Sequence, residues 1–282
     1  MENLPKIPWY HVGHLIAEGG TAKVYWGIDL RSGFPVAIKE LKIRHFKNPV
    51  IRRKFIEEAQ MYLYMEHPNI CKLVEFVDLE TTGQVFIIME FIEGKDLEQY
   101  IYTEIGLLPE KQALPMFLEI LDTVAYLHNN GVLHLDLKPN NVMLCPNGKL
   151  KLIDLGIASR MTDASAQTGY GTPAYMPPEQ TEKGRVGKYT DVFALGVMLF
   201  QMLTGHLPFT SDNPDPRQNL NEIRNKIKFA PAPQMSSFYP PLNNGGLQFI
   251  VERALDKQPS ARYQSCEEFA RAIKDYMKKK RI

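Results

Sequence analysis

Cysteine is scarce in this 282-residue sequence, which contains three: Cys71, Cys145 and Cys266. They lie too far apart for a zinc-ligand or Cys-x-x-Cys spacing, so neither kind of site is expected. An odd and sparse set of cysteines is typical of reduced thiols in a cytoplasmic protein. We therefore expect three buried, inert thiols and a cytoplasmic location.

Long apolar runs and an excess of one charge are also lacking. No apolar stretch near the N-terminus is long enough for a signal peptide, and the longest apolar run, residues 192–203, falls short of the about 20 residues that span a bilayer. The 33 Lys and Arg residues balance 32 Asp and Glu residues, for a formal net charge of +1. These absences predict no membrane span in this chain and no nucleic-acid partner.

The rest of the composition is typical of a globular protein, with 44% hydrophobic and 23% charged residues. The length suits about two compact units. Between residues 48 and 66, Asn48 and Pro49 suit the start of a helix whose apolar residues recur at helical spacing. Runs rich in β-branched and aromatic residues predict five strands, at residues 9–17, 23–28, 36–41, 73–79 and 85–90.

After the fifth strand the pattern is mostly helical. Pro115 lies within one apolar helical stretch and predicts either a kink or a later start of that helix. Thr190 is expected to cap a second apolar helix, which ends before Gly205. Residues 208–241 are expected to be irregular with short helical pieces, and a last helix is expected to start near Cys266.

A short loop and a lysine stand out in the strand-rich part. The loop at residues 17–22 has small residues that let backbone N–H groups approach phosphate oxygens, although an ordinary turn would look the same. Lys39 lies in an apolar strand, and Glu58 on the following helix is a candidate partner for its charge. The simpler alternative is a lysine at a strand edge and a glutamate on a solvent-exposed helix face.

Polar residues gather in a second segment with a more specific pattern. Residues 134–141, His-Leu-Asp-Leu-Lys-Pro-Asn-Asn, bring an acid, a lysine and an amide close together in the sequence, and Asp154-Leu155-Gly156 follows. Two carboxylates and an amide can bind a hard cation and orient a hydroxyl group. Because packing alone does not require these polar groups between apolar strands, the segment is expected to carry chemistry.

Together the motifs resemble those of eukaryotic-type protein kinases, most closely the bacterial eukaryotic-like Ser/Thr kinases. The glycine loop, Val-Ala-Ile-Lys, His-Leu-Asp, Asp-Leu-Gly and Pro-Pro-Glu occur in the order of that family and extend over essentially the whole chain. The resemblance implies an α+β, bilobal fold within one kinase domain, residues 1–282. A five-stranded antiparallel lobe with one main helix would span residues 9–90, a hinge 90–94 and a mostly helical lobe 95–282.

The resemblance implies a reaction as well: transfer of the γ-phosphoryl group of ATP to Ser or Thr hydroxyls of protein substrates, with autophosphorylation and a role in signalling. Asp136 would orient the hydroxyl and accept its proton, and Lys138 would neutralise the transferred group. Lys39 would contact the α- and β-phosphates while paired with Glu58. Mg²⁺, or Mn²⁺ in its place, would be the metal cofactor.

The nucleotide would be held by the glycine loop and the hinge. Val24 and Ala37 would cover the adenine ring, and backbone groups of Glu90 and Ile92 would bind its edge. The alternative is that Val24, Ala37 and Met143 are ordinary core residues. The implied cofactor-binding residues are Ala17, Glu18, Gly19, Gly20, Val24, Ala37, Lys39, Met89, Glu90, Ile92 and Met143, and the implied metal ligands are Asn141 and Asp154.

Further roles implied by the resemblance lie around the catalytic segment. Residues 171–176 would seat the substrate backbone, and Glu179 would form a structural ion pair with Arg262. Asp191, at the start of an apolar helix, would brace the catalytic loop, although an acid there also suits the helix dipole. The substrate loop, residues 171–176, favours a protein as the substrate over a small molecule.

Leu135 departs from the family pattern in a way that bears on regulation. It replaces the arginine that, in many relatives, grips a phosphate on the activation segment through charged hydrogen bonds. We therefore expect that activity does not require phosphorylation of Ser165 or Thr168 by that route. Lys138 together with Asn140 is typical of the Ser/Thr-specific pattern.

Two other function classes remain open. A pseudokinase would act as a binding module, but such sites usually lack one of the residues that are intact here. A small-molecule phosphotransferase of related fold would not need the substrate loop. The basic residues 278–281 are expected to be a solvated helix C-terminus. The alternative is a juxtamembrane segment, which would make the chain the cytoplasmic domain of a longer membrane-anchored protein.

Overall fold

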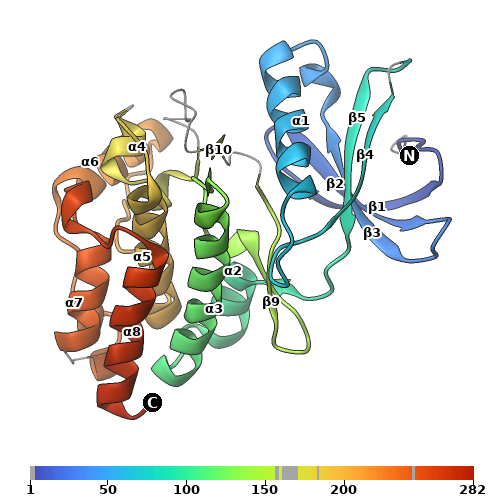
Figure 1. The fold of residues 1–282 in the computed structure, drawn as a ribbon. Coiled ribbons are helices and arrows are strands. Elements are labelled where there is room, and N and C mark those ends of the chain that lie inside the picture. Colours follow the sequence, from blue (N-terminus) through green and yellow to red (C-terminus); the bar gives the residue numbers. More distant parts are fainter. Residues whose placement is uncertain (1–3, 80, 156–158, 161–170, 183, 243–244) are drawn as a thin grey trace. The chain divides into compact units, whose positions relative to one another are not determined.

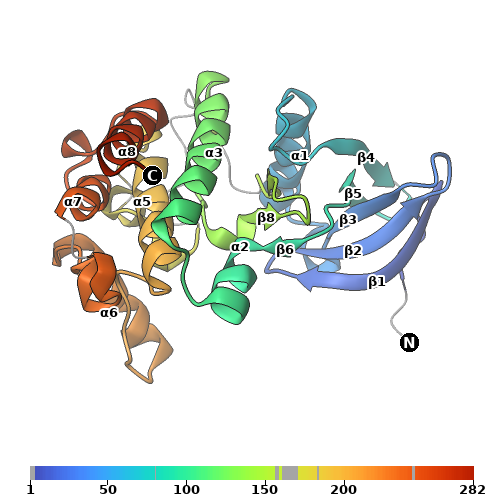
Figure 2. The same ribbon diagram turned by 90° about the horizontal axis from the view of Figure 1, so that it is seen from below.

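The computed structural model describes residues 4–79, 81–155, 171–182, 184–242 and 245–282, together with the backbone of Ser159 and Arg160. These residues fall into two compact units. One lies within Met1–Gly94 and Ile153–Gly156, and the other within Lys95–Leu152 and Ile157–Ile282. Figures 1 and 2 show the elements of each unit, which are described separately below.

The first unit is a five-stranded antiparallel sheet with one long helix, as the sequence predicts. The strand order is β1-β2-β3-β5-β4, and each strand end lies within one residue of its expected position. The elements are β1 (Tyr10–Glu18), β2 (Ala22–Asp29), β3 (Pro35–Leu41), the 3₁₀ helix η1 (Ile43–His45), helix α1 (Pro49–Leu63), β4 (Leu73–Leu79) and β5 (Gln84–Glu90).

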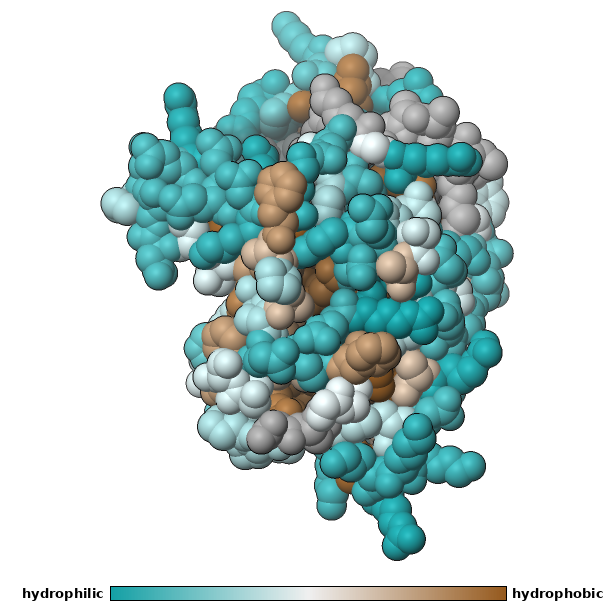
Figure 3. Space-filling model, turned by 90° about the vertical axis from the view of Figure 1, so that its left-hand side faces the viewer, coloured by the Kyte–Doolittle hydropathy of each residue, from teal (hydrophilic) through white to brown (hydrophobic). Residues whose placement is uncertain are grey.

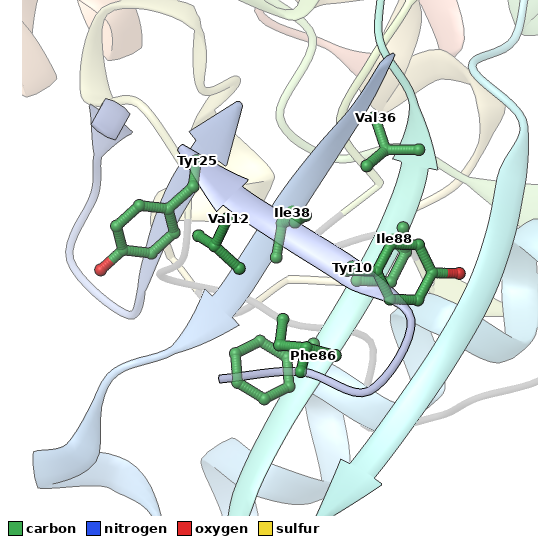
Figure 4. Packing of buried hydrophobic residues seen from close by; sticks show 8 residues of the cluster. Tyr10, Val12, Tyr25, Val36, Ile38, Phe86 and Ile88 are labelled. Atoms are coloured by element: carbon green, nitrogen blue, oxygen red, sulfur yellow. The ribbon is translucent and has the colours of Figure 1, made fainter. Parts of the chain in front are cut away.

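One face of this sheet forms a hydrophobic core, shown in Figure 4. Alternate residues of a strand point to the same face, so Val36 and Ile38 of β3 join Phe86 and Ile88 of β5. Lys39 lies between these positions in register and therefore belongs to the opposite face. The other members of the core are Ile7, Tyr10, Val12 and Tyr25.

Helix α1 starts where its capping residues predict. The Asn48 side chain accepts hydrogen bonds from the backbone N–H groups of Val50 and Ile51, at 3.1 and 3.2 Å, and Pro49 is the first helical residue. The helix ends at Leu63, earlier than expected. Its buried residues are Phe55, Glu58, Ala59 and Tyr62, so a carboxylate lies among apolar side chains.

The second unit is mostly helical, again as predicted. Helix α5 is buried from Thr190 to Thr204, and α3, α7 and α8 pack against it. Its helices are α2 (Leu97–Gln99), the π-helical η2 (Tyr100–Ile105), α3 (Glu110–Asn129), α4 (Pro178–Thr181), α5 (Lys188–Thr204), α6 (Pro216–Phe229), α7 (Gly245–Ala254) and α8 (Cys266–Lys280).

Short strands and 3₁₀ turns connect these helices. Strands β6 (Lys95–Asp96), β8 (Val142–Leu144) and β9 (Leu150–Leu152) form one small sheet, and β7 (Val132–Leu133) pairs with β10 (Ser159–Arg160). The 3₁₀ turns are η3 (Pro139–Asn141), η4 (Pro173–Tyr175), η5 (Met235–Ser237), η6 (Pro240–Leu242) and η7 (Pro259–Ala261). Two of these turns, η3 and η4, carry candidate site residues.

Two sequence expectations for this unit are wrong, and one of two alternatives for a third feature is excluded. Helix α3 starts at Glu110 and contains Pro115, so Pro115 does not delay its start, and the kink stays a prediction. Thr190 is not the cap of α5: Gly187 is, and its N–H donates to the Thr190 hydroxyl at 3.1 Å. The stretch 208–241 contains α6, a full helix capped by the Asp215 side chain, which apolar spacing missed because only Ile227 is buried.

The cysteine expectation holds for two of the three thiols. Cys71 and Cys266 are buried, and burial raises the pKa of the Cys266 thiol well above its usual value. Cys145 is only partly buried, which contradicts the expectation. It lies after β8 in a turn, where its N–H donates to the Lys149 carbonyl at 2.9 Å.

The described helices include none that is both long and apolar enough to cross a lipid bilayer. The molecular face in Figure 3 is mainly hydrophilic, with separate apolar patches between charged and polar side chains. Apolar residues are therefore concentrated inside the two units, as in buried α5.

Gly196 marks a close contact between α5 and the end of α7. A Cβ atom there would lie 2.8 Å from Ala254 Cβ and 3.1 Å from Leu255 Cδ2. Although alanine is the better helix former, we expect Gly196→Ala to lower the free energy of unfolding by about 1–3 kcal/mol through overpacking. Urea denaturation measures this. Gly245→Ala is the matched control, because its Cβ would meet nothing within 4 Å. Equal stability of the two variants would contradict the prediction.

Candidate active site

Four of the expected nucleotide-binding residues share one face of the first unit's sheet. Val24 lies opposite Lys39 in the β2–β3 pairing, and Ala37 lies opposite Met89 in the β3–β5 pairing. Residues directly opposite each other in a ladder share a face, as do alternate residues of β3. All four therefore lie on the face opposite the hydrophobic core of Figure 4.

Lys39 is held between two carboxylates. Its Nζ lies 2.6 Å from Glu58 Oε1 and 3.1 Å from Asp154 Oδ1. Burial disfavours the lysine charge, but Asp154 and Glu58 outweigh it and raise the pKa of Lys39. Burial and the Asp154 carboxylate also raise the pKa of Glu58 to about 7, although Lys39 opposes this shift. The alternative of an unpaired edge lysine with a solvent-exposed glutamate is wrong, because Glu58 is 4% exposed.

The segment that carries Asp154 is fixed to the same unit at a second point. The Tyr62 hydroxyl of α1 donates to the Ile153 carbonyl at 3.0 Å, and Leu155 is buried. Helix α1 therefore positions Asp154 in two ways. Tyr62 binds the residue before it, Ile153, and Glu58 binds Lys39, which in turn binds Asp154. Gly156, the last residue of the expected Asp-Leu-Gly motif, lies outside the described residues.

The expected phosphate loop is a tight turn between β1 and β2. Ala17 and Glu18 end β1, and Gly19 N–H donates to the Ala22 carbonyl at 2.9 Å. A Cβ on Gly20 would meet nothing within 4 Å. Since neither glycine has a positive φ, the turn does not itself require glycine. The small residues leave the loop backbone accessible to a ligand, which fits a phosphate group.

The residues expected to bind adenine at the hinge lie at the end of β5 and just after it. Met89 is buried, whereas Glu90 and Ile92 are half-buried. Glu90 N–H donates to the Lys72 carbonyl at 3.0 Å, and Cys71 Sγ lies 3.6 Å from the Glu90 carbonyl oxygen. The backbone at Glu90 is therefore fixed by the chain that leads into β4.

In the second unit, the Asp136 carboxylate is oriented by donors on both oxygens. Oδ1 accepts hydrogen bonds from the backbone N–H and the hydroxyl of Thr172, at 2.8 and 3.0 Å. Oδ2 accepts one from Lys138 Nζ at 3.0 Å, and Lys138 also donates to the Thr172 hydroxyl at 2.8 Å. A carboxylate fixed in this way, 16% exposed, can orient a hydroxyl group and accept its proton.

The backbone before Asp136 is held by a buried acid. Asp191 accepts hydrogen bonds from the N–H groups of His134 and Leu135, both at 2.8 Å, and lies 2.8 Å from His128 Nε2. Burial alone would raise the pKa of Asp191, but these bonds, led by His128, lower it below its usual value. The expectation that Asp191 braces the catalytic loop is confirmed.

Leu135 has a left-handed backbone conformation, with φ at 65°. Besides the Asp191 bond to its N–H, its carbonyl accepts a hydrogen bond from Gln180 Nε2 at 2.8 Å. Gly171 passes close by: a Cβ there would lie 3.2 Å from the Leu135 oxygen. A positive φ is unfavourable for leucine, and these contacts offset that conformational free energy and hold the turn in place.

Asn141 and Met143 follow in η3 and β8. Asn141 is buried, and its Nδ2 donates to the Asp136 carbonyl at 2.8 Å. This bond commits the amide nitrogen and leaves Oδ1 as an oxygen ligand, the kind that Mg²⁺ prefers, and the Asp154 carboxylate is of the same kind. Each of the two side chains, taken within its own unit, therefore offers an oxygen that suits a hard cation. The described residues contain no group of three or more His, Cys, Asp or Glu suited to a metal ion.

A second ion pair, also expected, joins Arg262 to Glu179 of α4. Arg262, fully buried, binds Glu179 through two hydrogen bonds of 2.8 and 2.9 Å. Glu179 Oε1 also accepts from the Thr190 hydroxyl at 3.0 Å. The pair thereby ties η7 and α4 to α5, and the expected Glu179–Arg262 contact is confirmed.

Three residues of this network were missed by sequence reasoning: Thr172, Gln180 and His128. Thr172 lies in the segment predicted only to seat the substrate, Gln180 lies just after it in α4, and no spacing rule links either residue to residues 134–136. His128 lies near the end of α3, and nothing in the sequence links it to Asp191. Ser165 and Thr168 lie outside the described residues, as do the side chains of Ser159 and Arg160.

The sequence matches the protein kinase domain over residues 10–277. The chain belongs to the protein kinase family. It is 34% identical over 266 residues to a probable serine/threonine-protein kinase of Streptomyces coelicolor, covering 92% of this chain and 38% of that protein. It is 32% identical over 269 residues to serine/threonine-protein kinase PrkC of Bacillus subtilis, covering 94% and 40%.

Serine/threonine-protein kinase PknB of Mycobacterium tuberculosis is similar to the same extent, with 32% identity over 266 residues, 92% of this chain and 41% of that protein. The expected family, including its bacterial members, is thus confirmed. The kinase domain described here spans about two fifths of the length of these curated relatives.

The Thr172 hydroxyl contacts both Asp136 and Lys138, which also bind each other directly. We expect Thr172→Ala to lower kcat about tenfold or more, because both charged side chains lose a shared positioning contact. The free energy of unfolding should change by no more than about 1 kcal/mol. Thr172→Ser keeps the hydroxyl and should retain kcat within about threefold. Steady-state kinetics with a protein substrate tests the pair, and equal kcat values for the two variants would contradict the assigned contact.

Proposed function

We propose that this domain is an ATP- and Mg²⁺-dependent protein serine/threonine kinase. The observation that carries the proposal is the Asp136 carboxylate, whose two oxygens are held by Thr172 and Lys138 while the backbone before it is held by Asp191. The Lys39–Glu58 ion pair, with Nζ and Oε1 2.6 Å apart, supports it independently. A binding module would need neither arrangement.

The proposed phosphate-binding groups belong to the first unit. Lys39 would bind the α- and β-phosphates, since its ammonium group is kept charged by Glu58 and Asp154. Gly19 and Gly20, with Ala17 and Glu18 before them, would let the loop backbone approach the phosphates closely. This division suits phosphoryl transfer, in which the protein positions charge rather than forms covalent bonds.

Asn141 and Asp154 are the proposed metal ligands. Each offers an oxygen of the kind that Mg²⁺ binds, and Mn²⁺ would accept the same ligands. When bound, the metal ion would neutralise charge on the phosphate oxygens. The chain's own part is orientation: the Asn141 amide is fixed by its bond to the Asp136 carbonyl, and Asp154 by Lys39.

Asp136 and Lys138 are the proposed catalytic residues of the second unit. Asp136 would accept a hydrogen bond from the substrate hydroxyl and take its proton. Lys138, 3.0 Å from Asp136 Oδ2, would supply positive charge next to the transferred group. The Thr172 contacts with both side chains support a Ser or Thr hydroxyl of a protein as the acceptor, and autophosphorylation would be one instance.

The proposed adenine-binding groups are apolar side chains and backbone groups. Val24 and Ala37 lie on the Lys39 face of the sheet, and Met89 shares it. Backbone groups of Glu90 and Ile92 would bind the edge of the ring, and the half-buried Met143 would contribute an apolar contact. Such apolar surfaces with a few backbone polar groups are typical of small-molecule sites.

Asp136→Asn tests the proposal most simply. Asp136 would contact the hydroxyl and not ATP, so we expect kcat to fall about 10²- to 10⁴-fold while the dissociation constant for Mg·ATP changes by less than about twofold. Radiolabelled ATP with a generic protein substrate gives kcat, and calorimetry gives the ATP affinity. The exposed Asp212 offers a control of equal charge change, Asp212→Asn.

Wild-type protein that binds ATP but transfers no phosphate would identify a pseudokinase. Transfer to small molecules alone would identify the other phosphotransferase class. An Asp136→Asn variant with near-normal kcat would show that another group accepts the proton. Phosphate transfer to serine or threonine of a protein, lost in Asp136→Asn and kept in Asp212→Asn, is the expected outcome.

A further inference from the structure

The tip of the glycine loop is fastened to the segment that follows β3. The Gly20 carbonyl accepts a hydrogen bond from the Arg44 guanidinium, and the Thr21 carbonyl accepts one from Lys42 N–H at 2.9 Å. Lys42 Nζ also forms an ion pair with Glu18, 2.5 Å from its Oε1. These three contacts lie on successive parts of one short loop, all within the first unit.

Arg44 is itself oriented by its neighbour. Arg44 Nε donates to His45 Nε2 at 3.0 Å. This bond fixes the orientation of the planar guanidinium, whose Nη2 donates to the Gly20 carbonyl. The 3₁₀ helix η1 that carries both residues is closed by the bond from His45 N–H to the Lys42 carbonyl, at 2.8 Å. Arg44 therefore approaches Gly20 from a short, ordered helix rather than from an unstructured loop.

A hydrogen bond to the Gly20 carbonyl fixes the whole peptide group that follows it. The peptide unit is planar and trans, so its N–H, which belongs to Thr21, points away from the carbonyl. With the carbonyl directed at Arg44, the Thr21 N–H is directed away from η1. A cation on the carbonyl also polarises the amide and makes its N–H a stronger donor.

The Gly19 amide of the loop is already engaged, and of the other loop amides it is the Thr21 N–H that belongs to the peptide group bound by Arg44. Gly19 N–H donates to the Ala22 carbonyl at 2.9 Å within the turn. Neither Gly19 nor Gly20 has the positive φ that would explain a glycine, and a Cβ on Gly20 would meet no atom within 4 Å. The absence of side chains here therefore keeps the Thr21 amide accessible to a ligand.

We propose that Arg44, held by His45, is a positioning residue that sets the direction of the Thr21 N–H toward the phosphate groups of the bound nucleotide. Arg44 acts through the Gly20–Thr21 peptide and does not itself contact the nucleotide. This inference rests on the proposed function, because it assigns the loop to the phosphates of ATP. The ligand group it concerns is the phosphate chain, not the adenine ring or the ribose.

Nucleotide affinity measured on the whole chain tests this role without relying on turnover. Calorimetry would give dissociation constants of Mg·ATP, Mg·ADP and adenosine for wild type, Arg44→Ala and Arg44→Lys. We expect Arg44→Ala to weaken ATP and ADP binding about three- to tenfold, the range of one ordinary hydrogen bond, with adenosine binding unchanged. Arg44→Lys keeps a donor and should recover part of the ATP affinity.

Arg53→Ala is the matched control. Arg53 is an exposed arginine of α1 whose Nε donates to Glu57 Oε1 at 2.7 Å, so its removal causes the same loss of charge in the same unit. Unchanged ATP affinity in Arg44→Ala, or an equal loss for adenosine, would overturn the role of Arg44 while leaving the kinase proposal intact. A wild-type chain that binds adenosine and ATP equally would reject the proposed phosphate site itself.

Discussion

The hydrogen bonds of the Asp191 carboxylate are the interactions on which the position of Asp136 in the helical unit depends. Asp191 is fully buried in the first turn of α5. It accepts two backbone hydrogen bonds from the catalytic loop and lies against His128 of α3. A buried carboxylate is tolerated only when its lone pairs are satisfied, and a buried N–H without a partner costs about 1–3 kcal/mol. The Asp191 carboxylate and the two backbone N–H groups therefore satisfy one another, and the loop has one stable position relative to α3 and α5.

Holding the loop in this position requires an unfavourable backbone conformation at Leu135, which nearby hydrogen bonds offset. Leu135 adopts a left-handed conformation, which costs roughly 1–2 kcal/mol for a residue with a side chain. Asp191 holds its N–H and Gln180 its carbonyl, so the turn is held on both sides. The next residue, Asp136, is thereby directed toward Thr172. Leucine at this position is buried and does not bring the charge that arginine would bring.

Local signals predicted most of the fold and only part of this network. Runs of β-branched and aromatic residues and the Asn48-Pro49 cap were sufficient to place the strands and helix of the first unit, because these signals lie within each element. Helix α6 was missed because its signal is a cap and not an apolar face. Thr172 and Gln180 were missed because their partners lie far away along the chain. Only tertiary structure brings such residues together, whereas Lys39, Asp136 and Asp154 lie in motifs that the sequence itself displays.

The most direct test of this account is Asp191→Asn, a change of nearly equal size that replaces an acceptor oxygen with a donor. The account predicts that kcat falls about hundredfold or more, the cost of a small displacement of Asp136. It also predicts that the His134 and Leu135 amides exchange hydrogen at least about tenfold faster. Mg·ATP affinity should stay within about twofold of wild type, which controls for folding. A variant with normal kcat and unchanged amide exchange would contradict the claim that this buried carboxylate positions the catalytic loop.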